Sequence, residues 1–424
     1  MYPAARIPPS KGAFAIDLVK VIQHFHCPAA VDAQATTAAE LRSLLTGRQL
    51  ADSTVAVAVG SRGISCISDV VRTSISVLRT LGARPFIIPA MGSHGGACAR
   101  GQEELLASYG ITEAAMRAPI RSCMDTIELG EDAMGTRVFM DRLAAEADHT
   151  LVINRVKPHT DFHGATESGI IKMCVIGLGK HEGAKEIHSY GIDGLRNRIV
   201  PAHRLVVSRG NLSGGIAIVE NARKEPMLIR ALSPGAFETE EPGLLETARG
   251  NMPSLPAEDL DVLLVDRMGK DISGTCVDTG VVGRIRIAGQ PEPETPSIRT
   301  IVADGLTAAS HGNALGVGLL DIISRRLYDA IDQEATRQNV LTSSFLERGK
   351  IPLVAPTYAE AFRWALRCTP VPAGRDPRIA RIRDTLHLEE LYISPAALAT
   401  LPKTPSGRWC EVTDHTLGAT EAWR

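Results

Sequence analysis

The 424-residue sequence lacks several features that would mark a class of protein directly. Its eight cysteines contain no CxxC pair, so neither a cysteine-rich zinc site nor an iron–sulfur cluster is indicated. Scattered cysteines in a chain of this length are typical of reduced thiols, and we expect a cytoplasmic protein. No apolar run reaches about 18 residues, and the first residues, MYPAARIPPSKGAF, lack the basic-then-apolar pattern of a secretory signal.

The chain also lacks an excess of charge of either sign. The formal net charge is −2, without a basic stripe or an acidic tail, which argues against nucleic acid or an anionic membrane as the main partner. Aromatic residues make up only 4% of the chain. The whole chain is 44% apolar and 22% charged, which is the composition of a globular protein. It is long enough to form two domains.

The first third of the chain has the pattern of a parallel α/β sheet. A β-branched apolar run at 52–60 predicts a buried strand, and apolar residues at helical spacing predict a helix over 68–82. A second strand is predicted at 83–90, so the three elements form a βαβ unit with a right-handed crossover. Further elements are predicted as a helix at 101–116 and strands at 148–156 and 214–220.

Two α/β domains are expected. We predict an N-terminal domain over 1–250 with a Rossmann-like parallel sheet and flanking helices, and a smaller C-terminal α/β domain over 259–424. The polar stretch 233–260, which contains proline and glycine at both ends, is interpreted as a bridge between them. The active site is expected in the cleft between the domains. Within the C-terminal domain, a strand and loop are predicted at 259–274 and helices at 316–331 and 357–368.

Three predicted strands of the N-terminal domain are each followed by cationic or imidazole side chains. In an open parallel sheet, ligands bind beyond the carboxyl ends of the strands. Each of these residues alone has an ordinary explanation as a loop residue, but their convergence favours an anion site with imidazoles that move a proton near neutral pH. The residues are Arg62, then His94, and then Arg155, Lys157, His159 and His163.

The segment 152–191 holds four of the twelve histidines. His159 and His163 are four residues apart, but the glutamate of an HExxH zinc protease is absent. Lys172 and His188 are sixteen residues apart, and the glycines between them predict a break that lets the chain return. A helix starting just before Lys172 would favour a bound phosphate at its N-terminus.

These residues, in this order, resemble the nickel-pincer lactate racemase family, most strongly over residues 50–190. The resemblance implies that Lys172 covalently holds pyridinium-3,5-bisthiocarboxylic acid mononucleotide, the nickel-pincer nucleotide, and that His188 coordinates the nickel. It also implies that Arg62 binds the substrate carboxylate. His94 in MGSHGG and His159 in KPH match the two histidines that act as acid and base.

The resemblance also suggests which neighbouring residues line the cofactor and the substrate. Ser93, Gly95 and Gly96 around His94, and Gly169 before Lys172, are expected to contact the cofactor.

The sequence departs from the family pattern in two places. The loop before the lysine is longer here, so His163 competes with His159, and the glycine-rich run is reduced to SGIIK. Two interpretations of the segment 268–284, with Lys270, Asp271 and Arg284, stay open: it lines the substrate side, with Lys270 as a substrate contact, or it is a structural loop between strands.

The activity that the resemblance implies is inversion of the C2 carbinol centre of a 2-hydroxy acid, by racemisation or epimerisation. The partners would be that small substrate and, transiently, the proteins that synthesise the cofactor. Two alternatives stay open. One is a hydrolase or lyase that uses the histidine cluster around an ordinary divalent metal ion. The other is a non-catalytic homologue that binds the cofactor.

Overall fold

The computed structural model describes residues 16–60, 63–372, 374–401 and 408–417. Arg62, the residue predicted to bind the substrate carboxylate, therefore lies outside the described residues. None of the described helices has the length and apolar character needed to cross a membrane.

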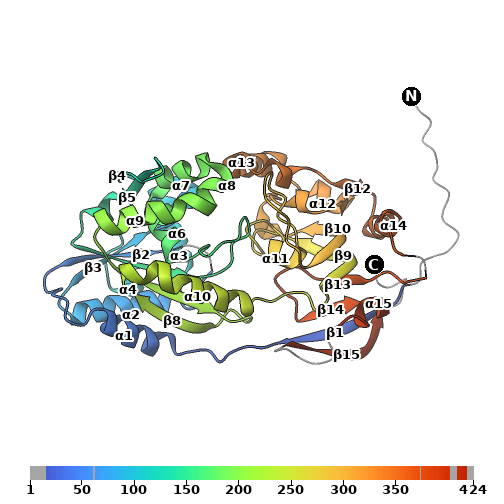
Figure 1. Ribbon diagram of the computed structural model, residues 1–424, viewed down its shortest axis with the longest axis horizontal. Coiled ribbons are helices and arrows are strands. Elements are labelled where there is room, and N and C mark those ends of the chain that lie inside the picture. Colours follow the sequence, from blue (N-terminus) through green and yellow to red (C-terminus); the bar gives the residue numbers. More distant parts are fainter. Residues whose placement is uncertain (1–15, 61–62, 373, 402–407, 418–424) are drawn as a thin grey trace. The chain divides into compact units, whose positions relative to one another are not determined.

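The chain divides into two compact units. The N-terminal unit is His26–Met252, and the C-terminal unit combines the segment that ends at Phe25 with the chain from Pro253 onward. Each unit contains parallel strands and helices, so the predicted α/β fold with two domains is confirmed (Figure 1).

Five strands form the main sheet of the N-terminal unit. In spatial order they are β3 (Arg84–Pro89), β2 (Thr54–Val59), β6 (His149–Arg155), β7 (Leu212–Glu220) and β8 (Pro226–Leu232). The first four are parallel, and β8 runs antiparallel to β7. Because the chain goes from β2 to β3 on one side and returns to β6 on the other, the carboxyl ends of β2 and β6 form the topological switch point where such sheets bind ligands.

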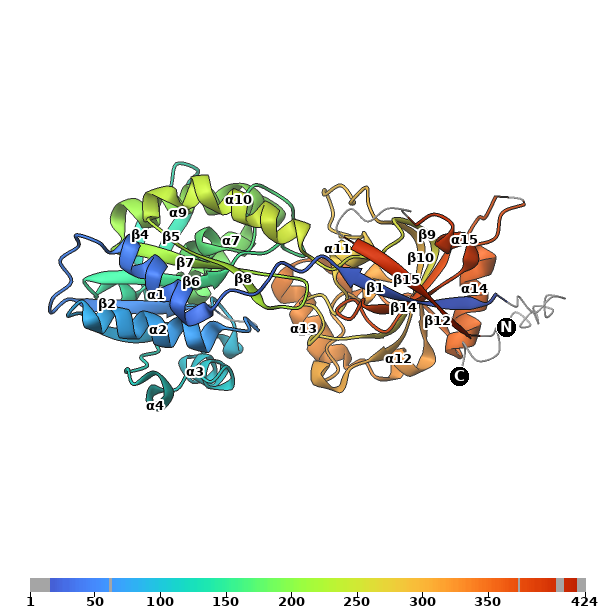
Figure 2. The same cartoon turned by 90° about the horizontal axis from the view of Figure 1, so that it is seen from below.

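Helices cover both faces of this sheet (Figure 2). Alternate residues of β2, Val55, Val57 and Val59, share a buried core with α1 (Ala33–Leu44) and α2 (Ile67–Thr80). The opposite face packs against Ile170 and Phe237, which a side chain at Gly215 of β7 would overlap. The other elements of this unit are α3 (Ala99–Ser108), α4 (Glu113–Met116), the hairpin β4 (Thr126–Glu131) and β5 (Arg137–Asp141), α5 (Arg142–Ala145), α6 (Ile170–Lys172), α7 (Lys180–Ser189), α8 (Gly191–Asp193), α9 (Ile199–Arg209) and α10 (Phe237–Gly250).

The predicted strands at 52–60, 83–90, 148–156 and 214–220 and the helix at 68–82 are confirmed. The single helix predicted over 101–116 is wrong, because it divides into α3 and α4. Gly110 has φ +76°, a conformation that ends the first helix, and the Thr112 hydroxyl accepts from Ala115 N to begin the second.

The bridge predicted at 233–260 is mostly the helix α10. Buried apolar residues at helical spacing, such as Phe237, Leu244 and Ala248, pack it into the N-terminal unit despite Pro242. Only a few residues after Gly250 remain as a connection. The chain before His26 belongs to the C-terminal unit, so the unit boundaries differ from those predicted at both ends.

Eight strands form the sheet of the C-terminal unit, and short helices accompany them. In spatial order the strands are β12 (Leu353–Ala355), β11 (Ile322–Ser324), β10 (Ser297–Leu306), β9 (Asp259–Met268), β13 (Ile379–Ile382), β14 (Glu390–Ile393), β1 (Leu18–Phe25) and β15 (Arg408–Leu417). The first five are parallel and the last three connect in antiparallel pairs. The helices are α11 (Thr279–Val282), α12 (Arg325–Asp329), α13 (Gln333–Ser343), α14 (Tyr358–Cys368) and α15 (Pro395–Leu398).

Two predictions for this unit are confirmed and one is wrong. The strand predicted from residue 259 is β9, and the helix predicted at 357–368 is α14. The helix predicted at 316–331 instead contains the strand β11, since Ile322 and Ile323 pair in parallel with β10 and β12. The Ser324 hydroxyl then accepts from Leu327 N and begins α12.

A buried ion pair ties together four segments of the N-terminal unit. Lys180 and Asp141 are both fully buried, with Nζ 2.9 Å from Asp141 Oδ2. Nζ also donates to Pro89 O at 2.5 Å and to Gln102 Oε1 at 3.1 Å. Gln102 in turn donates to Gly92 O at 2.9 Å. The end of β3, α3, the end of β5 and the start of α7 are therefore joined at one ammonium group.

We predict that Lys180→Met lowers the free energy of unfolding by about 3–5 kcal/mol, because the buried Asp141 carboxylate loses its cation. Urea denaturation measures this loss. The control is Lys185→Met, which changes an exposed lysine of the same helix and should cost less than about 0.5 kcal/mol. A similarly small cost for Lys180→Met would show that the pair does not stabilise the fold.

Candidate functional site

The carboxyl ends of β3, β2 and β6, which precede the predicted site residues, lie at one edge of the sheet because these strands are parallel neighbours. The chain leaves β2 through Gly60. A side chain there would come within 2.3 Å of Met173 Cε and 2.6 Å of Asn154 Oδ1, so either side chain would have to shift to make room for it. Asn154 of β6 also donates to Gly169 O at 2.9 Å. The end of β2 thus packs directly against the segment that carries Lys172.

After β6 the chain forms a closed loop, residues 157–168, which we call the histidine loop. Its ends pair as an antiparallel bridge, in which Lys157 N donates to Ser168 O at 2.8 Å and Ser168 N donates to Lys157 O at 3.2 Å. Phe162 is buried within the loop, at 1% exposure. Both candidate acid/base histidines, His159 and His163, lie on it.

A buried carboxylate organises the histidine loop. Glu167 accepts from His159 N at 2.5 Å, Gly164 N at 3.0 Å and His163 Nδ1 at 3.3 Å, and it pairs with Arg249 of α10. Burial acts to raise the pKa of Glu167, but the donors, led by His163 and including Arg249, outweigh it and hold that pKa below its ordinary value. Glu167 is therefore an ionised centre that positions both histidines.

His159 lies against Lys172. Its Nε2 is 2.5 Å from Lys172 Nζ, and its Nδ1 accepts from Asp161 N at 3.1 Å. The ring packs on Phe162 with centroids 4.9 Å apart. His163 is in a different environment, since its side chain is 46% exposed against 13% for His159. Of the two competing histidines, His159 is the one in contact with the lysine.

The chain between Lys172 and His188 turns as the glycines predicted. A π-helical segment, Met173–Gly177, follows α6, and Lys180 has φ +53° at the start of α7. Burial lowers the pKa of the His188 imidazole, the Lys172 charge acts in the same direction, and Asp161 opposes both. His188 is therefore within electrostatic reach of Lys172 and is neutral at pH 7, the form that binds a metal.

His94 lies in the loop after β3. Its backbone N–H donates to Met91 O at 3.1 Å, and its carbonyl accepts from Gln102 Nε2 at 3.3 Å. Gly95 has φ +66°, and a side chain there would overlap Gly101 at 2.6 Å. The loop conformation is thus fixed by backbone contacts. The roles of His94, Ser93, Gly95 and Gly96 toward a ligand stay predictions.

The start of α6 is already occupied by a carboxylate. Glu241 of α10 accepts from Ile170 N at 2.6 Å and Ile171 N at 3.0 Å, and a side chain at Gly169 would lie 2.4 Å from its Cδ. The expectation that this N-terminus favours a bound phosphate is therefore wrong, because Glu241 takes that place. Burial raises the pKa of Glu241 to about 7, although the two backbone hydrogen bonds act to lower it.

The basic residues predicted in the C-terminal unit make internal contacts. Lys270 Nζ donates to Gly274 O at 2.7 Å and to Asn339 Oδ1 at 2.6 Å. Arg284 donates to Asp321 Oδ2 at 2.6 Å and to Leu319 O at 3.0 Å. These bonds give Arg284 a structural role, and the substrate role of Lys270 stays a prediction.

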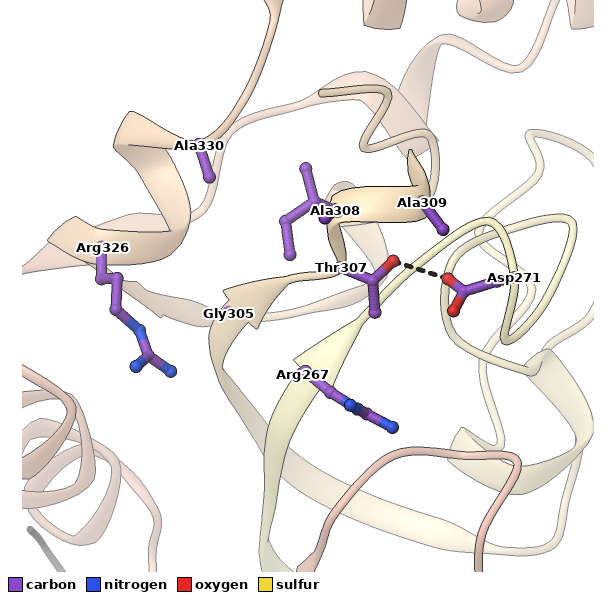
Figure 3. A pocket seen from close by; sticks show the side chains of 9 residues that line it. Arg267, Asp271, Gly305, Thr307, Ala308, Ala309, Arg326 and Ala330 are labelled. Carbon is purple, nitrogen blue, oxygen red and sulfur yellow. Dashed lines mark hydrogen bonds between the residues drawn. The ribbon is translucent and has the colours of Figure 1, made fainter. Parts of the chain in front are cut away.

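A pocket of about 520 Å³ lies at the carboxyl ends of β9 and β10 (Figure 3). Arg267, Arg326, Asp271 and Thr307 supply its polar side chains, and Thr307 Oγ1 donates to Asp271 Oδ1 at 2.5 Å. Arg267 bonds to Asp384, and Arg326 pairs with Asp304. Neither arginine was predicted from the sequence as a site residue, although Arg267 stands near the end of the predicted strand β9. Glycine and alanine complete most of the wall.

No protein-family model matches the chain, and no curated protein matches it. Among solved structures, the chain is similar to the lactate racemase apoprotein from Thermoanaerobacterium thermosaccharolyticum. The TM-score is 0.54 at 13% sequence identity, and the match covers 88% of this chain and 98% of the other. At this identity the likeness shows a shared fold.

The raised pKa of Glu241 predicts a pH-dependent stability. Below its ordinary pKa of 4.5 the group is protonated in both states and contributes nothing. As the pH rises toward 7 the unfolded chain loses this proton first, so the folded state is progressively destabilised. Glu241→Gln removes this effect, and its stability relative to the unmodified chain should rise by roughly 2–3 kcal/mol between pH 5 and pH 8. Urea denaturation at both pH values measures the difference, and a constant difference would contradict the assignment.

The Arg249–Glu167 pair predicts a local effect on the histidine loop. Arg249→Met leaves the buried carboxylate without its cation, so the backbone amides of His159 and Gly164 should exchange hydrogen about tenfold faster or more. The matched control is Glu246→Ala, which removes only the exposed partner of Arg249. Equal exchange in both variants would show that Arg249 does not hold the loop.

Proposed function

We propose that the chain is a racemase or epimerase that inverts the C2 carbinol centre of a 2-hydroxy acid, using a nickel-pincer nucleotide attached to Lys172. The observation that carries this proposal is the contact between Lys172 and His159, with His188 in electrostatic reach, at the switch point of the sheet. The fold shared with a lactate racemase apoprotein supports it.

The donor set fits such a cofactor. Lys172 offers a primary amine for a covalent link on a half-buried helix end. His188 offers a neutral imidazole nitrogen, since burial lowers its pKa, and a borderline metal such as nickel accepts imidazole together with sulfur donors. Gly96, beside His94, has open space where a side chain would stand, so its backbone can be approached closely.

The cofactor, when bound, supplies a site that reversibly accepts a hydride from the carbinol carbon. In this proposal His159 would take the proton of the substrate hydroxyl and would return it to the same oxygen to complete the reaction. His94 does the same on the other side of the carbinol carbon. An imidazole serves both directions because its ordinary pKa is near neutrality. Arg62 holds the substrate carboxylate through paired N–H donors, as proposed from the sequence.

The structure supports the alternative function, a hydrolase with an ordinary divalent metal ion, less well than it supports the proposed one. That reading requires several ligands around one ion, drawn from His94, His159, His163 and His188. Across the described ranges, no group of three or more His, Cys, Asp and Glu side chains is arranged to hold a metal ion. His159 and His163 are instead engaged by Lys172, Asp161 and Glu167.

We predict that protein co-expressed with a nickel-pincer synthesis system carries a mass addition on Lys172 and about one nickel per chain. Peptide mass spectrometry and metal analysis measure both. Lys172→Ala should abolish the addition, and His188→Ala should lower nickel retention while leaving the fold intact. Lys185→Ala, on the exposed surface of α7, should change neither.

An unmodified Lys172, beside a working racemase control from the same cells, would defeat the cofactor proposal. If the addition is present, a screen of 2-hydroxy acids for loss of optical rotation tests the reaction. His94→Ala should then abolish turnover at unchanged nickel content. Of His159→Ala and His163→Ala, we expect only the first to do so.

A further inference from the structure

The sheet of the C-terminal unit has a topological switch point of its own. From β9 the chain goes to β10 on one side, continues outward to β11 and β12, and returns to β13 on the other side of β9. As at β2 and β6, a ligand site is expected beyond the carboxyl ends of these strands. The pocket of about 520 Å³ lies at this edge, and its volume is within the range of roughly 300–1,000 Å³ for small-molecule sites (Figure 3).

Arg267, near the end of β9, is held from one side only. Its Nε donates to Asp384 Oδ2 at 3.0 Å, and among the described residues its two terminal nitrogens make no hydrogen bond. Asp384 is fully buried just beyond β13, where its Oδ1 accepts from Leu386 N and His387 N, each at 3.0 Å, and from His387 Nδ1 at 2.7 Å. Burial acts to raise the pKa of Asp384, but the donors, led by His387 and Arg267, outweigh it and hold this pKa below its ordinary value. An ionised carboxylate thus fixes the guanidinium and leaves its terminal nitrogens for a ligand.

Arg326 of α12 forms a second pair of the same kind. It pairs with Asp304 of β10, and a side chain at Gly305 would lie 3.2 Å from its Nη2, so the glycine leaves room for the guanidinium. In both pairs the carboxylate is the more buried partner. Side-chain exposure is 37% for Arg267 and 0% for its partner, and it is 70% for Arg326 and 14% for Asp304. Each pair therefore presents its positive end to the pocket, which favours an anionic group there.

A hydrogen-bond acceptor lies on another part of the wall. Thr307 Oγ1 donates to Asp271 Oδ1 at 2.5 Å, and within the part of the chain that the structure describes Asp271 Oδ2 has no hydrogen bond (Figure 3). The Asp271 side chain is exposed, so Oδ2 is available to accept from a hydroxyl group of a ligand. Short side chains complete this wall, at Ala308, Ala309 and Ala330.

We propose that this pocket binds a hydroxy carboxylate. The terminal nitrogens of a guanidinium match the two oxygens of a carboxylate, and Asp271 accepts from a hydroxyl of the same molecule. A phosphate ester, with a charge of about −1.5 to −2 at pH 7, fits less well. Asp271 repels it, and a buried carboxylate already balances each arginine. Because a water molecule occupies roughly 30 Å³ in the liquid, the pocket has room for an acid longer than lactate.

The inference assigns a second small-molecule site and does not use the reaction proposed at Lys172. Every residue in it belongs to the C-terminal unit. A chain that binds the hydroxy carboxylate, but whose Lys172 stays unmodified beside a working cofactor system, would uphold the inference and defeat the proposed function. A working racemase whose C-terminal pocket binds no hydroxy carboxylate would do the reverse.

The test is isothermal titration calorimetry on the full chain, expressed without cofactor synthesis, with three six-carbon probes. These are gluconate, sorbitol, which lacks the carboxylate, and hexanoate, which lacks the hydroxyl groups. Gluconate should bind with a Kd below about 10 mM and at least about tenfold tighter than either of the others. Weaker binding of gluconate, or equal binding of sorbitol or hexanoate, would overturn the inference. Inorganic phosphate that binds more tightly than gluconate would also overturn it, in favour of a phosphate site.

Two neighbouring arginines of α12 assign the binding to the pocket. Arg326→Met should weaken gluconate binding at least about fivefold. Its matched control is Arg325→Met, which removes an exposed arginine that pairs with Asp329 and should leave the affinity within about twofold. Equal losses in the two variants, or no loss in either, would overturn the assignment. Unchanged circular dichroism spectra show that both variants are folded.

Two further variants separate the carboxylate contact from the hydroxyl contact. Arg267→Met should weaken gluconate and hexanoate alike, because both carry the carboxylate. Asp271→Ala, at an exposed position, should weaken gluconate at least about threefold without weakening hexanoate, because only gluconate offers a hydroxyl group. A loss of hexanoate binding in Asp271→Ala, or an unchanged affinity for gluconate, would contradict the hydroxyl contact.

Discussion

The ionised Glu167 carboxylate holds the histidine loop in one conformation. It is fully buried, and four donors surround it: two backbone amides, the His163 ring and Arg249. A carboxylate in such a place costs free energy unless every lone pair is used, so the loop must close around it. The amide of His159 is one of these donors, and its ring is thereby directed toward Lys172. The position of the His159 ring beside Lys172 therefore depends on the hydrogen bonds that the buried Glu167 carboxylate requires.

Helix α10 supplies one basic and one acidic side chain that contact the segments around Lys172. Arg249 pairs with Glu167 on the histidine loop, and Glu241 closes the start of α6, just before Lys172. Arg249 is a cation and Glu241 an acid whose pKa burial raises to about 7, and the two lie about two turns of helix apart. The segment predicted as a bridge between domains is therefore a helix that supports the candidate site. Its position also explains why a phosphate has no place at the start of α6.

Local patterns in the sequence were sufficient to predict the strands of the N-terminal unit and the residues at which they end. β-branched runs followed by glycine predicted β2, β3 and β6, and parallel order then brought their carboxyl ends to one edge. The spacing of Lys172 and His188, with glycines between them, predicted the turn that the structure has. The partners of the site could not be predicted, since Glu167 and Arg249 are 82 residues apart and Glu241 and Ile170 are 71 apart. Lys180 and Lys270 illustrate the same limit. Each stands in a loop or helix start that favours an exposed cation, yet each is bonded inside its unit by residues remote in sequence.

The strand β1 has a consequence for the order in which the chain is built. It precedes the entire N-terminal unit in sequence, but in the sheet it lies between β14 and β15, two of the last strands of the chain. During synthesis on a ribosome, residues 26–252 emerge with all the strands of their own sheet, whereas β1 must wait until about 365 further residues have followed it. The C-terminal unit is thus completed by segments that flank the N-terminal unit on both sides in the sequence. A ribosome that stops before β14 would release a finished N-terminal unit preceded by the unpaired β1 segment.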